Sequence, residues 1–95
     1  MSVKIVIKRY VPANKAEELS PLLRNLRALA TKETAYLSGE TLKRIDGRGE
    51  YLVISTWQTL GDWERWINND QRKVIQAKID MLLGEPTEYA VYQNE

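Results

Sequence analysis

The sequence predicts one small α+β domain, spanning residues 1–95, with its elements in the order β-α-β-β-α-β. Three observations support this fold class. Short segments of alternating apolar residues mark strands, longer segments with apolar residues every three or four positions mark helices, and 95 residues suffice for a single domain. Because such a chain buries roughly 65% of its unfolded surface, we expect a thin core. A binding pocket would then be shallow, or completed by a second copy.

Residues 3–11 are predicted to form the first strand. Val3, Ile5 and Ile7 fall on one face, whereas Lys8 and Tyr10 fall on the other. Pro12 ends the strand, because proline cannot donate a hydrogen bond to a neighbouring strand.

A helix is expected to follow. Asn14 has the properties of an N-cap, and Glu17, three residues later, fits a capping box. Apolar residues recur with helical spacing through Ala30, which predicts one buried stripe. Pro21 either kinks this helix or begins a second helical segment.

The middle of the chain is typical of a β-hairpin. A strand over residues 36–45 and a strand over residues 50–58, rich in β-branched and aromatic residues, flank the turn Asp46-Gly47-Arg48-Gly49. The predicted loop therefore has about four residues.

The second helical region is predicted to be split. Thr59 caps a short helix, Asp70 can cap the next, and Gly84 ends that helix. Residues 87–93 alternate as a final strand. The complete order is the ferredoxin-like arrangement, a four-stranded antiparallel sheet with helices on one face.

The face of the sheet away from the helices is expected to be apolar. Val6 and Tyr10 lie opposite the helix-facing residues of the first strand, and the third strand has apolar residues at odd and even positions alike. A monomer rarely exposes so large an apolar patch. We therefore expect a homodimer that packs through this open face, unless the residues are scattered surface aromatics or the C-terminus covers them.

The composition excludes several classes of protein. The chain has no cysteine and no histidine, which excludes disulfides, thiolate nucleophiles, Ser-His-Asp triads and the usual zinc sites. A net charge of +1 argues against a nucleic-acid partner, and the apolar segments are too short to cross a membrane. No signal peptide is evident, so we expect a cytoplasmic protein. Because cysteine and histidine are absent, we also expect no metal site.

The segment from Ser55 to Trp66 carries a recognisable motif. A strand ends in Trp57, a capped turn follows, and a short helix ends in Trp66 before an Asn-Asp break. This segment resembles the signature of the antibiotic biosynthesis monooxygenase family, and the element order extends the resemblance over nearly the whole chain. The resemblance implies a dimeric α/β barrel in which each protomer has a pocket between its helices and its sheet.

The resemblance also implies which chemistry to consider. One branch of the family degrades haem with an Asn in the first strand, the Trp of the short helix, and a His ten residues after that Trp. Here Trp66 is present, but Gln76 occupies the histidine position and the first-strand position lies near Lys8. Glutamine is a poor haem ligand, so an oxygenase built on this chain is expected to work without haem or any other cofactor.

Five residues are candidates for the substrate pocket. The resemblance assigns Trp66 to a pocket wall, although a core position is equally open, and it draws attention to Gln76. Arg72 could hold an oxyanion, Lys8 could lie at a pocket edge or dimer seam, and Tyr36 could donate a hydrogen bond to a phenol. The alternatives are a solvated charge for Arg72 and Lys8, and packing for Tyr36. Trp57 and Trp63 are expected in the core, and no catalytic base can be named.

Two functions remain open at this stage. The first is a cofactor-independent monooxygenase that oxidises a small aromatic phenol or hydroquinone with O2, in which the substrate supplies the electrons. The second is a non-oxygenase isomerase or binding protein for small molecules on the same scaffold. A purely structural dimer without a ligand is a third alternative. Fold alone does not decide among them.

Overall fold

The computed structural model describes residues 1–95, and its four strands form one antiparallel sheet. The elements in chain order are β1 (Val3–Tyr10), the 3-10 turn η1 (Ala13–Lys15), α1 (Ala16–Thr31), β2 (Tyr36–Lys43), β3 (Glu50–Trp57), α2 (Leu60–Ile67), α3 (Asp70–Leu83) and β4 (Glu88–Gln93). The strand order is β2-β3-β1-β4. The predicted ferredoxin-like fold is confirmed, including the division of the second helical region into two helices.

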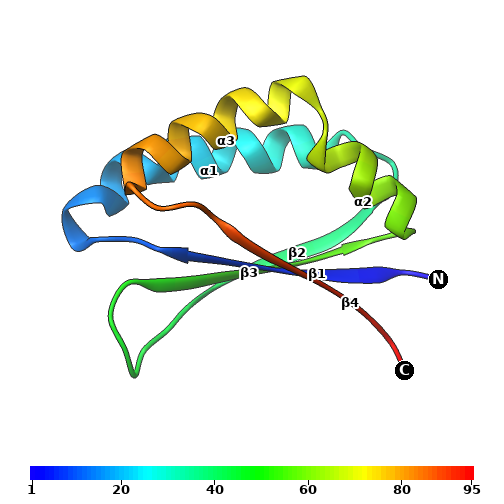
Figure 1. Cartoon of the computed structure of the whole chain (residues 1–95), viewed down its shortest axis with the longest axis horizontal. Helices are drawn as coiled ribbons and strands as arrows, with labels where there is room; N and C mark the ends of the chain where they lie inside the picture. The colour runs from blue at the N-terminus through cyan, green and yellow to red at the C-terminus, as the bar shows by residue number, and fades with distance from the viewer.

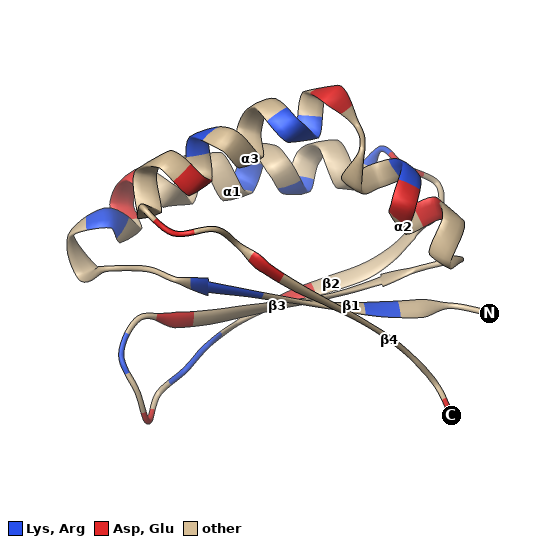
Figure 2. Cartoon of the chain, viewed as in Figure 1, with Lys and Arg blue, Asp and Glu red and all other residues tan.

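The molecule has two layers. All three helices lie on the same face of the sheet, and the opposite face carries no element (Figure 1). No helix is both long and apolar enough to cross a membrane. Charges of both signs are interspersed along the helices, in keeping with the net charge of +1 (Figure 2).

The alternation of side chains assigns each strand residue to one face. Ile5 of β1 is fully buried under the helices and pairs with Ser55 of β3, so the odd-numbered residues of both strands face the helices. The even-numbered residues face away from the helices, and among them Val6 and Ile54 are half-buried within the single chain. Both faces therefore carry apolar side chains, as the sequence predicts.

The core on the helix side has two parts. One is built around Trp57 and Trp63 and continues into Ala30 of α1. The other joins Leu19 of α1 to the fully buried Ile79 of α3. The two parts lie toward opposite ends of the helical layer. A cavity can remain between them, in the space between α1 and the sheet.

Several local predictions are corrected by the structure. Asn14 does not cap α1, because η1 occupies residues 13–15 and leads directly into a helix that has no side-chain cap. α1 continues as one helix through Pro21. Asn69, not Asp70, caps α3, with its side chain accepting a hydrogen bond from the Arg72 backbone N–H. Thr59 caps α2 as predicted, accepting from the Asp62 N–H.

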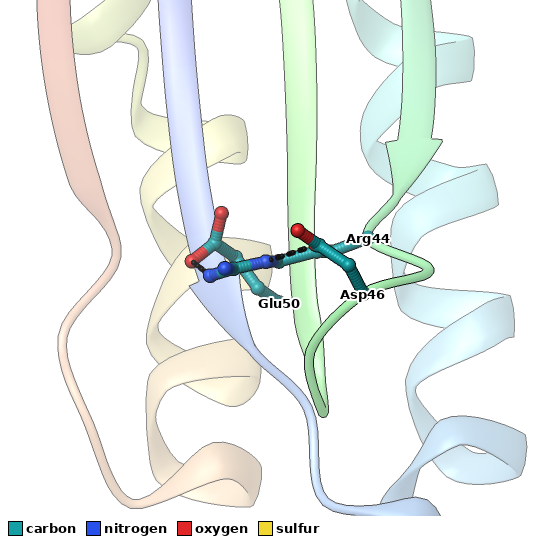
Figure 3. Close-up of polar contacts among 3 residues, drawn as sticks. All are labelled: Arg44, Asp46 and Glu50. Carbon is teal, nitrogen blue, oxygen red and sulfur yellow. Dashed lines mark hydrogen bonds and ion pairs between the residues drawn. The ribbon is translucent and has the colours of Figure 1, made fainter.

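The loop of the β2–β3 hairpin is longer than predicted, because β2 ends at Lys43 and the loop covers residues 44–49. Arg44 fastens this loop by pairing with Asp46 at 2.6 Å and with Glu50 at 3.4 Å (Figure 3). Gly49 adopts φ +72°, and its carbonyl accepts a hydrogen bond from the Val11 N–H at 2.6 Å. The base of the hairpin is thus tied to the end of β1.

We predict that two glycine-to-alanine substitutions affect stability differently. Gly84 ends α3 with φ +73°, where a Cβ meets no atom within 4 Å, so Gly84→Ala adds only backbone strain and should cost about 1 kcal/mol. Gly61 lies in the first turn of α2 with no atom nearer than 3.6 Å to an added Cβ, so Gly61→Ala should be neutral or stabilising. Urea denaturation monitored by tryptophan fluorescence measures both. An equal loss of stability in the two variants would contradict the assigned backbone conformations.

Candidate functional site

Trp57 is the centre of an aromatic cluster under α2. The residue is 1% exposed, and its ring packs edge-on against Tyr36 at 5.3 Å and against Trp63 at 6.0 Å, measured between ring centroids. Trp66 stacks on it at 5.6 Å with an interplanar angle of 26°. The β3–α2 connection is short, so the indoles of the strand end and of the helix are brought together.

This cluster forms one wall of a cavity between α1 and the sheet, with a volume of about 70 Å³. The remaining walls come from α1 and from the helix-facing residues of the central strands. Thirteen residues line the cavity: Ile7, Arg9, Leu23, Leu26, Arg27, Ala30, Tyr36, Thr41, Val53, Ser55, Trp57, Trp63 and Trp66. The lining is mainly apolar and includes two arginines but no carboxylate.

Arg9 is the buried charged residue of this cavity. It follows Val3, Ile5 and Ile7 on the helix-facing side of β1 and is only 4% exposed. Its Nη2 donates to Gln76 Oε1 at 3.3 Å, whereas its Nε–H is buried without a hydrogen-bond partner. Burial lowers the pKa of the Arg9 guanidinium from its ordinary value. Such an unpaired donor is costly in a folded protein, and a ligand oxygen would satisfy it.

Gln76 lies behind Arg9 and holds it in place. Besides accepting from Arg9, its Nε2 donates to Asp80 at 2.9 Å and to the Thr87 hydroxyl at 2.8 Å. Thr87 in turn donates to Asp80 at 3.1 Å. The amide therefore connects α3 and the segment before β4 to β1, and each of its polar atoms has a partner.

Arg72 forms a second buried polar cluster. It is 5% exposed, donates to the Ile67 carbonyl at 3.2 Å and to the Tyr89 hydroxyl, and places its guanidinium 5.4 Å from the Tyr89 ring centroid. Burial raises the pKa of the Tyr89 phenol, and the charge of Arg72 opposes that rise. Arg72 thus joins the end of α2 to β4.

The structure places the five predicted pocket residues in three locations. Trp66 and Tyr36 line the cavity. Gln76 and Arg72 are buried behind it and are not part of its lining. Lys8 lies on the opposite face of the sheet, because β1 alternates and its neighbour Arg9 faces the helices. Trp57 and Trp63 are buried in the core as expected, and they line the cavity as well.

The sequence reasoning missed Arg9 and Arg27. A signal for Arg9 was present, since it continues the odd-numbered face of β1 that Val3, Ile5 and Ile7 define, and a charge on a core-facing position is unusual. Arg27 is exposed on α1 and reaches the cavity through its long side chain, which the helical pattern alone does not indicate.

The arrangement suits binding and electrostatic stabilisation. Flat aromatic walls accommodate a planar ring, and the buried guanidinium stabilises negative charge that forms on a ligand oxygen. No Asp, Glu or Lys lines the cavity, so the lining offers no conventional proton acceptor. The chain also presents no group of three or more carboxylates that could together hold a metal ion.

Comparison with known proteins identifies relatives by sequence and by fold. A sequence model described as antibiotic biosynthesis monooxygenase matches residues 2–78. Comparison with curated proteins gives no significant match.

Solved structures with the same fold are distant in sequence. A conserved protein from Methanosarcina mazei is 20% identical with a TM-score of 0.91, over 100% of this chain and 94% of that one. A mutant of SnoaB, a cofactor-independent oxygenase from Streptomyces nogalater, is 15% identical with a TM-score of 0.85, over 99% and 93%. Rv0793 from Mycobacterium tuberculosis is 16% identical with a TM-score of 0.86, over 100% and 96%. At these identities the likeness is one of fold.

We predict that Gln76→Leu destabilises the protein by roughly 2 kcal/mol, because the buried Arg9 guanidinium loses its acceptor and Asp80 loses a donor. The double variant Arg9→Met with Gln76→Leu should recover part of this loss, since the unpaired charge is then absent. Denaturant unfolding of both variants measures the difference. Arg9→Met alone completes the cycle, and a double-variant cost equal to the sum of the two single-variant costs would show that the Arg9–Gln76 contact carries no coupling.

Proposed function

This chain belongs to the antibiotic biosynthesis monooxygenase family, and we propose that it is a cofactor-independent monooxygenase that oxidises a small aromatic phenol or hydroquinone with O2. Family membership rests on the match over residues 2–78. The observation that supports the proposal most directly is the position of Arg9, whose buried and unpaired Nε–H belongs to a residue of an aromatic-walled cavity.

The aromatic walls would bind the ring of the substrate. Trp66 and Tyr36 are the predicted pocket residues that line the cavity, and Trp57 lies between them with its ring packed against both. Offset or edge contacts with a planar ligand match the preferred geometry of aromatic pairs. A ring held there also displaces water, which strengthens the effect of nearby charges.

Arg9 would stabilise the anion of the substrate. A phenolate next to a buried guanidinium is favoured over the neutral phenol, and the phenolate is the better electron donor to O2. The substrate supplies all the electrons. One oxygen atom enters the ring to give a quinone, and the other leaves as water together with two hydrogens of the substrate, so atoms and electrons balance without metal or flavin.

Gln76 and Arg72 act as positioning residues in this proposal. Gln76 fixes the Arg9 guanidinium by accepting its Nη2–H at 3.3 Å. Arg72 fastens α2, which carries Trp63 and Trp66, to Tyr89 of β4. Neither side chain needs to touch the substrate to influence the reaction.

We predict O2 consumption with members of a panel of naphthols and hydroquinones, in the presence of a metal chelator and without added cofactor. Arg9→Met should lower kcat/KM by about a hundredfold, as expected for the loss of an oxyanion donor. Trp66→Ala should raise KM for the same substrates. Lys78→Gln, an exposed change on α3 away from the cavity, is the control. An oxygen electrode corrected for spontaneous oxidation measures the rates.

Two outcomes would decide against this activity. One is uptake no faster than spontaneous oxidation for the entire panel. The other is thermal stabilisation by these compounds without O2 consumption, which would favour the isomerase or binding protein.

We also propose that two copies pair through the open face of the sheet. Val6, Leu52 and Ile54 lie on that face, and the nearby Tyr10 and Tyr92 are 42% and 57% exposed. Packing a second sheet on the first would remove this apolar surface from water and form the expected dimeric α/β barrel. Lys8 lies on the same face, so the proposal places it at the dimer seam.

We predict that Ile54→Lys converts the dimer to a monomer, because a charge at the centre of the open face must be desolvated when two sheets pack. Sedimentation equilibrium at micromolar concentration distinguishes the two states. Lys78→Gln again provides the control. A wild-type protein that sediments as a single chain would refute the pairing.

A further inference from the structure

A single side chain separates two cavities on the helix side of the sheet. Arg27 extends from α1 and donates from Nη2 to the Thr41 hydroxyl of β2 at 2.9 Å. Arg27 and Thr41, together with Leu23, line the aromatic-walled cavity and also a neighbouring cavity of about 330 Å³. The Arg27–Thr41 hydrogen bond therefore lies at the boundary between the two spaces.

A fused aromatic ligand that packs against the tryptophans requires this boundary to open. The aromatic-walled cavity holds about 70 Å³. An apolar protein cavity that binds benzene measures about 150 Å³, and ligand sites generally exceed about 300 Å³. The aromatic-walled cavity is smaller than either value, whereas the neighbouring cavity alone exceeds both. A ring held against the tryptophans must therefore extend into the neighbouring cavity, and this requires Arg27 to release Thr41.

The charges around these spaces favour an acidic ligand. Arg9, Arg24 and Arg27 line one or both cavities, and no Asp or Glu lines either. Arg24 and Arg27 are bound only to neutral hydroxyls, those of Ser20 at 2.8 Å and of Thr41. The three ion pairs of the chain involve Arg44 and Arg65 instead. The cavity arginines are thus available to an anion.

We propose that the ligand of this site is an aromatic acid whose carboxylate binds Arg27, displaces Thr41 and so joins the two cavities. A guanidinium bonds a carboxylate through two parallel hydrogen bonds, each roughly twice as strong as a neutral one, so the exchange is favourable. The proposal rests on the proposed function only in placing the ring against the tryptophans. It adds the substrate class, a phenol or hydroquinone with a carboxylate, and makes Arg27 the residue that selects it.

Calorimetric titration without O2 tests the inference through a matched pair of ligands. The two probes are 2-naphthoate and its neutral isostere 2-naphthamide. Wild-type protein should bind the acid about tenfold more tightly than the amide, the difference expected between a charged and a neutral hydrogen-bond partner. Arg27→Gln should bring the ratio close to one, and Lys78→Gln should leave it unchanged.

A second variant tests whether the Arg27–Thr41 hydrogen bond must break for a ligand to bind or only supports the cavity wall. Thr41→Val removes the partner that the ligand must displace, so both probes should bind about threefold more tightly while the preference for the acid remains. If the Arg27–Thr41 bond only supported the wall of the cavity, its loss would weaken the binding of both probes.

Three results would overturn the inference: equal affinity of the wild type for acid and amide, an acid preference that survives in Arg27→Gln, or no binding of either probe at millimolar concentration. These failures are distinguishable from failure of the proposed function. Uptake of O2 with neutral hydroquinones, together with equal affinities, refutes the aromatic acid but retains the oxygenase. Selective binding of the acid without any O2 uptake retains the aromatic acid but refutes the oxygenase.

Discussion

The packing of the Trp57 indole is the interaction on which the remaining structure most depends. It lies at the end of β3, where the chain leaves the sheet, and contacts Tyr36 of β2 as well as Trp63 and Trp66 of α2. These contacts fix α2 above one end of the sheet and fix the start of β2 beside it. Because aromatic rings bury large areas in defined geometries, the same contacts that stabilise the fold also set the shape of the cavity wall.

The cavity therefore cannot be separated from the core energetically. Arg9 occupies a core-facing position of β1, where burial of its charge is costly. Gln76 offsets part of this cost, and Asp80 and Thr87 hold Gln76 in turn. The Nε–H of Arg9 has no hydrogen-bond partner in this network. Polar residues on α3 and before β4 thus determine how one donor is presented near a cavity that they do not line.

Most of the fold could be predicted from the sequence, because alternation and helical spacing act locally. Thr59 and Gly84 were identifiable as helix boundaries for that reason. The prediction that Asn14 caps α1 was wrong because a 3-10 turn precedes the helix, and nothing in the sequence distinguishes that turn from a first helical turn. The site was predicted in part. Trp66 followed from the family resemblance, whereas the Arg27–Thr41 contact joins two elements whose relative placement no local pattern encodes.

The two faces of the sheet have different physical roles, and this difference bears on how so small a chain can keep a cavity. Empty space costs stability, since the residues around it lose packing contacts. In the proposed function, the space near Arg9 on the helix side is kept for a ligand. The open face has no such requirement, and its apolar residues, including Val6 and Ile54, can all be used for packing. A second copy on that face would bury apolar surface and so offset the stability that the cavity costs on the helix side. Pairing and ligand binding would then be linked through the stability of one sheet.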